Sequence, residues 1–340
     1  MLKSTWLAIA AFALSASSAL AAGELHIYNW GEYTNPKLIE KFEKTYDVKV
    51  TLDFYDSNET MMSKVRAGGS GFDIVVPSDY AVAIMIEAGM LEKTEPASMA
   101  NFKNMDPAIV DIYFDKGRHY SVPWQLGLTS FVVDTAVYKG DVNSYSILFD
   151  PPAELKGRVN MLDDMTAIMH AAERYLGFPR CTSDKAQLKA VNELLNKAKP
   201  SWRTFSYDSL QLLAAKDVDA AMIWNGAAFR ARAQRNSLVF AYPKEGIEGF
   251  MDNVVILKGA ANIENAKLFQ NFIMDPENAA LISDFAKYNN GIVGSDKYLA
   301  QDFSGAPEIK RPEGVTPEYV APCPSEVVTM YNKIWTNLRK

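Results

Sequence analysis

Apolar and polar residues alternate along two early segments of the chain, residues 24–29 and residues 48–54, and predict a strand in each. Between them, Asn35 and Pro36 form a helix-start signal, with a capping side chain followed by proline at the first helical position. Residues 72–76 are almost continuously apolar, as expected of a buried parallel strand. A strand, a helix and a second strand in this order predict a βαβ unit, so we expect a sheet that begins parallel.

The same periodicities predict alternating helices and strands along the rest of the chain, and hence an α/β protein. Helices are expected at residues 57–65, 82–88, 166–176, 188–197, 210–216, 227–234, 261–274 and from Pro324 and Ser325 to the C-terminal end. Further strands are expected at residues 158–162, 218–224, 238–242 and 250–257. Residues 120–133 predict two strands with Pro123, Trp124 and Gln125 between them, which we expect to cross into a second lobe.

Aromatic and acidic residues gather at the ends of four predicted strands. These stretches are residues 28–33, 75–80, 222–225 and 250–252. Ligands of open α/β sheets bind outside the carboxyl ends of the strands, so we expect the four stretches to converge on one cleft. Tryptophan and tyrosine faces attract a cation, and a carboxylate accepts a charge-assisted hydrogen bond from an ammonium group. The sequence therefore predicts a cleft for a small organic cation.

The candidate residues of this cleft divide into rings and carboxylates. The rings are Trp30, Tyr33, Tyr80, Trp224, Phe250 and Tyr288, and the carboxylates are Asp164, Asp252, Glu32 and Asp79. Purely structural roles remain open, because a tryptophan after an apolar strand often packs in a core and residues such as Ser78, Asp79, Asp163 and Asp164 can cap the helices that follow. The repeated pairing of an aromatic residue with a carboxylate is what favours binding.

The N-terminal 22 residues have the pattern of a secretory signal peptide. Lys3 is the positive residue, residues 6–14 are the apolar core, and Ala19, Leu20 and Ala21 form a small-residue cleavage pattern. The apolar run is too short for a spanning helix. We therefore expect an exported protein without a membrane anchor.

The remaining length is more than one hydrophobic core usually serves, so two lobes are expected. We assign residues 23–128 with 251–298 to the first lobe and residues 129–250 with 299–340 to the second. Of the 340 residues, 48% are hydrophobic, which suffices for sizeable cores, and the formal net charge is −6. That charge argues against nucleic acid as a partner and favours cationic ligands.

Metal and catalytic motifs are absent from the sequence. The three histidines lack metal-ligand spacing, and the common nucleophile, phosphate-loop and dinucleotide motifs do not occur. A carboxylate pair for glycoside hydrolysis remains an open alternative. The two cysteines, Cys181 and Cys323, suit a disulfide in an exported protein, although the sequence leaves open whether they meet. We expect a binding protein without cofactor or metal rather than an enzyme.

With these residues in view, the chain resembles the periplasmic spermidine/putrescine-binding proteins of ABC importers along nearly its whole length. The resemblance rests on residues 28–33, 57–61, 73–80, 222–226, 243–246 and 251–252. It implies a two-lobed periplasmic-binding-protein fold of type II, in which a hinge closes on a polyamine, a monomer in the periplasm, and an ABC permease in the inner membrane as partner. By the same resemblance Asp164 and Asp252 accept the ammonium groups, and the residues that line the polyamine chain are Trp30, Tyr33, Ser78, Tyr80, Trp224, Phe250 and Tyr288.

The chain departs from the family pattern at a few of these positions. Phe250 stands in place of a tryptophan, Ala167 in place of a second carboxylate one turn after Asp164, and Gly31 in place of a hydroxyl residue. Residues 321–323 lack an expected glutamine. Fewer acceptors imply fewer or differently placed amino groups, so putrescine or another organic amine is as good a candidate as spermidine. A different solute on the same fold is the alternative, with Asp163, Asp79 or Glu32 as compensating acceptors.

Overall fold

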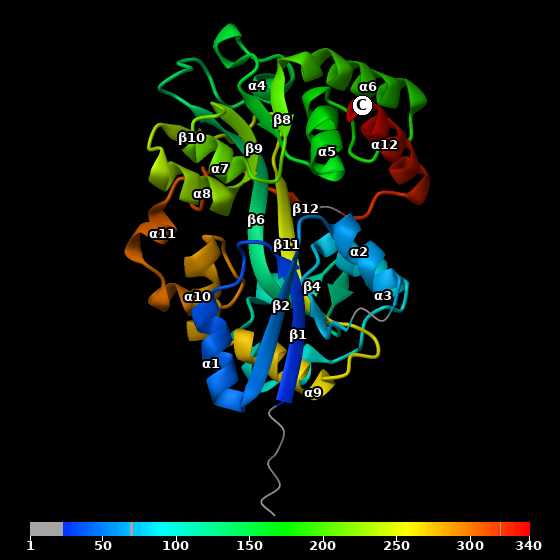
Figure 1. The fold of residues 1–340 in the computed structure, drawn as a ribbon, viewed down its shortest axis with the longest axis vertical. Helices are drawn as coiled ribbons and strands as arrows, with labels where there is room; N and C mark the ends of the chain where they lie inside the picture. The colour runs from blue at the N-terminus through cyan, green and yellow to red at the C-terminus, as the bar shows by residue number, and fades with distance from the viewer. Residues whose placement is uncertain (1–22, 69–70, 320) are drawn as a thin grey trace, which may run out of the picture.

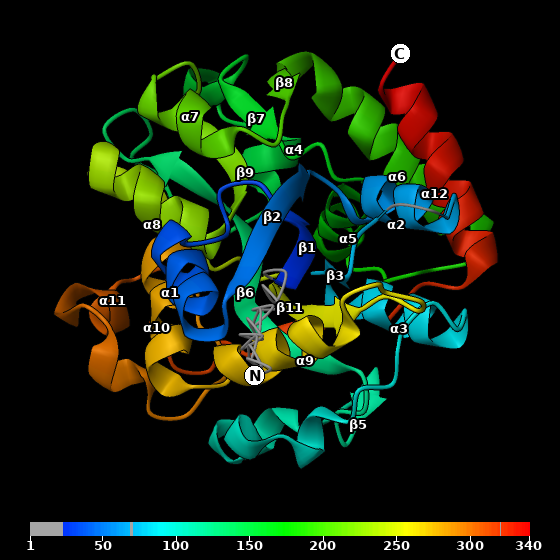
Figure 2. The same ribbon diagram turned by 60° about the horizontal axis from the view of Figure 1, so that its bottom comes forward.

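A computed structural model describes residues 23–68, 71–319 and 321–340 (Figures 1 and 2). The predicted signal peptide lies outside the described residues. Within the described part of the chain, every helix is too short or too polar to cross a lipid bilayer.

The N-terminal βαβ unit forms as its sequence predicts. Strand β1 (Gly23–Trp30) pairs in parallel with β2 (Val48–Tyr55), and α1 (Pro36–Tyr46) connects them. The side chain of Asn35 caps α1 by accepting a hydrogen bond from the backbone N–H of Lys37. The buried residues of α1 face the sheet, so the helix is held by burial of its apolar side as well as by its cap.

One ten-stranded sheet runs through the described molecule in the order β2-β1-β3-β11-β6-β9-β7-β8, with β10 beside β6 and β12 beside β11. The further strands are β3 (Ile74–Val75), β6 (Ser121–Asp134), β7 (Val159–Met161), β8 (Trp202–Phe205), β9 (Ala220–Trp224), β10 (Leu238–Phe240), β11 (Glu248–Ile256) and β12 (Glu318–Tyr319). A separate hairpin pairs β4 (Asp111–Ile112) with β5 (Asp115–Lys116). Strand β8 is not among the predicted strands.

Strands β6 and β11 are antiparallel and run from one lobe into the other (Figure 1). The prediction of two strands around Pro123, Trp124 and Gln125 is wrong, because β6 is continuous from Ser121 to Asp134. The register shifts opposite Asp252 and Asn253, which leaves Trp124 as an extra residue in β6. A proline, which has no N–H to donate, is tolerated beside such a bulge.

Helices cover the sheet in both lobes. Their bounds are α2 (Asn58–Arg66), α3 (Asp79–Glu87), α4 (Ser146–Phe149), α5 (Met165–Tyr175), α6 (Lys185–Ala198), α7 (Ser209–Ala214), α8 (Asn225–Gln234), α9 (Ile263–Ile273), α10 (Pro276–Ala286), α11 (Gln301–Gly305) and α12 (Ser325–Leu338). Helix α10 lies beside both α1 and α9 (Figure 2). Helix α10 is not among the predicted helices, although Asp275 and Pro276 form the same start signal as Asn35 and Pro36.

The buried side chains form separate cores for the two lobes. One core draws on residues 25–124 and 251–292, and includes the fully buried Phe42 and Phe269. Another draws on residues 131–241 and on α12, and includes Phe131 and Tyr331. A smaller cluster lies between β6, β9 and α8. Because the chain alternates between the two large cores, it passes between the lobes three times, through β6, through β11 and again between Ile292 and α12.

Candidate functional site

A cavity of about 570 Å³ lies between the lobes, beyond the ends of β1, β3 and β9. Every residue predicted for the cleft lines it, namely Trp30, Tyr33, Ser78, Tyr80, Asp164, Trp224, Phe250, Asp252 and Tyr288. Strand β11 confirms the strand predicted at residues 250–257, but Phe250 and Asp252 lie inside it, so their grouping with the strand ends is wrong. They reach the cavity because β11 crosses between the lobes directly behind it.

Asp252 is a buried carboxylate of this cavity that has two hydroxyl partners. The residue is 4% exposed. One carboxylate oxygen accepts a hydrogen bond of 2.7 Å from the Ser78 hydroxyl, and the other accepts one of 2.7 Å from the Tyr33 hydroxyl. Burial raises the pKa of Asp252 to about 7, against the opposing effect of these two hydrogen bonds. The carboxylate is therefore poorly stabilised when the cavity is empty, and a cation beside it would favour its charged form.

Ser78 occupies a helix-capping position but does not cap with its side chain. It precedes α3 and makes no side-chain capping bond, because its hydroxyl donates to Asp252. The side chain of Asn58 donates to the Ser78 hydroxyl over 3.1 Å and to the Tyr80 hydroxyl over 3.0 Å, and accepts from the Ser78 N–H. The cap of the preceding helix, α2, is Ser57, whose side chain accepts a hydrogen bond from the N–H of Thr60. Asn58 is thus free to hold two cavity residues, a role that the sequence did not reveal.

The aromatic walls are held by hydrogen bonds as well as by ring contacts. The Trp30 indole N–H and the Tyr55 hydroxyl both donate to the carbonyl of Val76, over 2.8 and 2.6 Å. Tyr33 and Phe250 each pack edge-on against Tyr288, with ring centroids 5.6 and 5.9 Å apart, and Tyr207 packs on Trp224 at 5.2 Å. Tyr55 and Tyr207 are cavity residues that the sequence analysis did not single out. Tyr55 directly follows the predicted strand at residues 48–54, whereas Tyr207 follows β8, which was not predicted.

Two glycines let these rings approach the backbone. A Cβ at Gly127 would lie 2.2 Å from Cζ of Phe250, and a Cβ at Gly226 would lie 2.5 Å from Cε2 of Tyr288. Contacts that short do not occur, so any side chain at either position would displace a ring of the cavity wall. The Tyr288 hydroxyl also accepts a hydrogen bond from the N–H of Ala227, which ties this ring to α8.

Asp164 both caps a helix and lines the cavity. One of its oxygens accepts a hydrogen bond of 3.0 Å from the N–H of Ala167 at the start of α5. Burial, with repulsion from Glu59, raises the pKa of Asp164 to about 7. The capping role and the cavity position are therefore compatible at this residue.

The compensating carboxylates considered from the sequence lie in different places. Asp163 pairs with Arg339 and is not among the cavity residues. Asp79 lines the cavity, and burial raises the pKa of its carboxyl well above the usual range. Glu32 lines the cavity and is exposed. Of the three compensating carboxylates, Asp79 and Glu32 thus line the cavity together with Asp164 and Asp252, and Asp163 does not.

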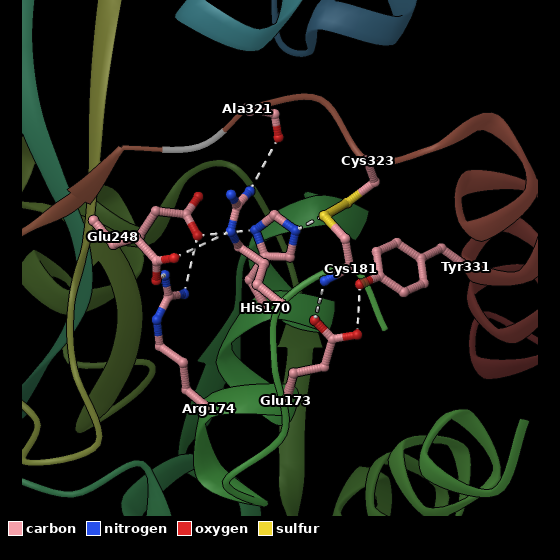
Figure 3. The surroundings of a disulfide bond; sticks show 10 residues. His170, Glu173, Arg174, Cys181, Glu248, Ala321, Cys323 and Tyr331 are labelled. Atoms are coloured by element: carbon pink, nitrogen blue, oxygen red, sulfur yellow. Dashed lines mark hydrogen bonds and ion pairs between the residues drawn. A yellow bond between two sulfur atoms is a disulfide. The ribbon is translucent and has the colours of Figure 1, made fainter. Parts of the chain in front are cut away.

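The two cysteines are joined, which answers a question that the sequence left open. The Cys181–Cys323 disulfide ties the loop after α5 to the segment before α12 (Figure 3). The Cys181 N–H donates to the buried carboxylate of Glu173, which also accepts a hydrogen bond of 2.5 Å from the Tyr331 hydroxyl. The disulfide and this carboxylate together hold α12 against α5.

The fully buried His170 connects the disulfide to the cavity wall. Its Nε2 is 3.6 Å from Sγ of Cys323, and its Nδ1 is 2.9 Å from a carboxylate oxygen of Glu248 (Figure 3). Glu248 lines the cavity and also pairs with Arg174 at 3.0 Å. Among the described residues His170 and the two sulfurs lie within 4.8 Å of one another, as metal ligands would. Because both sulfurs belong to the disulfide, this group does not form a thiolate metal site.

Two α/β lobes, joined by crossing strands and enclosing an aromatic and acidic cavity, define a two-lobed solute-binding protein. The chain belongs to the bacterial extracellular solute-binding protein family, whose model matches residues 37–310. Members of this family bind solutes for transport and are not enzymes.

Named relatives and a solved structure agree with this assignment. The chain is 33% identical to the spermidine/putrescine-binding periplasmic protein of Salmonella typhimurium, over 92% of this chain and 89% of that protein. It is 32% identical to the putrescine-binding periplasmic protein SpuD of Pseudomonas aeruginosa, over 93% and 91%. An ABC-transporter structure from Listeria monocytogenes superposes with a TM-score of 0.87 at 31% identity, over 93% of this chain and 99% of that one.

Proposed function

We propose that this protein captures an aliphatic polyamine outside the cytoplasm and delivers it to the membrane permease of an ABC importer. The observation that carries the proposal is the buried Asp252, which lies between two hydroxyl donors inside a cavity walled by aromatic rings. A carboxylate with a raised pKa gains most from a cationic partner, and the ring faces suit the alkyl chain and the ammonium groups.

The nine predicted cavity residues form the contact set of this proposal. Asp252 and Asp164 accept ammonium groups, and the others surround the chain between them. The lobes, residues 23–128 with 251–298 and residues 129–250 with 299–340, close about β6 and β11 when the ligand binds. The protein acts as a monomer in the periplasm, exported by its N-terminal 22 residues, and presents the closed form to a permease of the inner membrane.

Ligand binding is expected to raise the melting temperature of the purified mature protein. A ligand that binds only the native state at about one hundred times its Kd stabilises that state by about 2.7 kcal/mol. We expect putrescine, cadaverine or spermidine to give a saturable upward shift in a thermal-shift assay, and sugars and inorganic anions to give none. A flat response to every amine would contradict the proposed function.

The affinity for an amine is expected to fall as the pH falls below neutrality. Burial raises the pKa of Asp252 and of Asp164 to about 7 in the ligand-free protein. An ammonium group needs the ionised carboxylates, so binding requires loss of protons below that pH. Below about pH 7, each carboxyl that must lose its proton lowers the affinity by up to about tenfold for every pH unit.

Calorimetric titrations at about pH 8 and about pH 5.5 measure this dependence, and titrations in two buffers with different heats of ionisation count the released protons. In the ligand-free protein the same raised pKa values lower stability as the pH rises from about 4 to 7, because the native state binds more protons than the unfolded chain there. An affinity that does not change with pH over this range would show that neither Asp252 nor Asp164 contacts the ammonium groups of the ligand.

A further inference from the structure

Arg230 is the one basic side chain among the described residues that line the cavity. It lies on α8, three residues after Ala227, whose N–H donates to the Tyr288 hydroxyl, so both residues are on the helix face toward the cavity. Its neighbours on the same helix and just beyond it are neutralised, since Arg232 pairs with Glu308 and Arg235 pairs with Asp134 and Asp219.

Arg230 has no such partner within the described part of the chain. No carboxylate there lies within ion-pair distance of its guanidinium group, and its Nε atom is buried without a hydrogen-bond acceptor. A buried donor on a charged group without an acceptor is costly to leave unsatisfied. An acceptor on a ligand in the cavity would satisfy this donor.

Acidic groups act on Tyr80, whereas Tyr288 lies within electrostatic reach of both Arg230 and Asp252. Burial raises the pKa of Tyr80 well above its usual range, with repulsion from Glu59 and Asp164 adding to the effect. Burial also raises the pKa of Tyr288 to about 12, while Arg230 opposes that shift and Asp252 adds to it. Asp164 thus lies near Tyr80, and Arg230 lies near Tyr288, with Asp252 also within electrostatic reach of Tyr288.

A simple diamine does not use this arrangement fully. Its ammonium groups would pair with Asp252 and Asp164 and leave the Arg230 guanidinium without an acceptor. The cavity of about 570 Å³ falls in the range of sites for ligands larger than a four-carbon diamine. Guanidinium groups bind carboxylates with paired, charge-assisted hydrogen bonds.

We propose that Arg230 binds a carboxylate of the ligand, so that the preferred substrate is an aliphatic amine that also carries a carboxylate. The ammonium group of that ligand pairs with Asp252, and its carboxylate lies against Arg230 beside the hydroxyls of Tyr207 and Tyr288. This inference rests on the proposed capture of an amine and narrows it to a carboxylated class.

Calorimetry with three matched probes tests the inference: putrescine, 4-aminobutanoate, and putrescine acylated on one nitrogen with succinic acid. We expect at least one carboxylated probe to bind the unmodified protein about tenfold or more tightly than putrescine. Arg230→Gln should weaken the binding of that probe about 10- to 100-fold, because the carboxylate of the probe loses a charged donor. The affinity for putrescine should stay the same or rise, because the positive charge that repels its ammonium groups is gone.

Two further variants guard against indirect effects. Arg203→Gln removes an exposed arginine of β8 outside the cavity and should change no affinity. Arg230→Lys keeps the charge and should retain the preference for the carboxylated probe, which a misfolded protein would not do. Chemical denaturation of each variant verifies that it is folded.

The outcomes separate this inference from the proposed function. Tighter binding of putrescine than of both carboxylated probes, with no effect of Arg230→Gln, overturns the inference and leaves amine capture standing. Equal weakening of all probes by Arg230→Gln also overturns it, since Arg230 would then support the cavity and not bind a carboxylate of the ligand. Failure of every amine to bind overturns the proposed function itself.

Discussion

Replacing Asp252 by asparagine is expected to weaken the binding of an amine by about 30- to 150-fold, which corresponds to about 2–3 kcal/mol. The variant keeps the shape of the side chain but removes the charge that pairs with the ammonium group. The unfolding free energy of the ligand-free protein should change by less than about 1 kcal/mol, because a carboxyl with its pKa raised to about 7 is poorly stabilised as an anion. Calorimetry measures the first effect and urea denaturation the second.

Asp53→Asn is the matched control, because Asp53 is an exposed aspartate of β2 that does not line the cavity. It should leave both the affinity and the stability unchanged. Wild-type affinity in Asp252→Asn would remove this residue from the ligand site. The affinity of this variant should also depend less on pH than that of the unmodified protein, since one of the two titrating carboxyls is gone.

Removal of the disulfide by the double substitution Cys181→Ala and Cys323→Ala is expected to lower the unfolding free energy by about 2–4 kcal/mol. The bond joins residues 142 positions apart, so it restricts a large part of the unfolded chain. The entropy model sets an upper limit of about 5 kcal/mol for a loop of this length. Urea denaturation under oxidising conditions measures the difference, and the m-value shows whether the unfolded state has expanded.

Reductant supplies the control for this effect. A dithiol should destabilise the unmodified protein to the level of the double variant and leave the double variant unchanged. Ligand affinity should change little, because Arg174 still holds Glu248 at the cavity wall when the sulfurs are gone. Equal stability of the two proteins without reductant would show that the disulfide adds nothing to the folded state.

Local sequence patterns were sufficient to predict much of the fold. The cap at Asn35 and the alternation in β1 and β2 are properties of short segments, and the structure confirms the helix and both strands. The positions of Trp30 at the end of β1 and of Trp224 at the end of β9 follow from where apolar runs stop. The family resemblance is confirmed as well. It supplied the type of two-lobed fold, whereas the length of the chain had already indicated two lobes.

Other features depend on residues that are distant along the chain. Pro123 ordinarily ends a strand, yet β6 continues through it because a bulge forms against β11. Asp252 looked like a strand end, whereas it lies within β11 and is held by Ser78 and Tyr33, 174 and 219 residues away. Neither a bulge nor a long-range hydrogen bond has a signal in the nearby sequence.

From the amino-acid order alone came the class of fold, most element positions and the residue types of the cavity, because each of these depends on hydrophobic period, turn chemistry and short motifs. Only the folded chain decided that Asn58 holds Ser78 and Tyr80, that Cys181 meets Cys323, and that Arg230 lies in the cavity without an ion-pair partner among the described residues. The physical reason is that burial and pairing belong to the surroundings of a side chain, and those surroundings are assembled from both lobes.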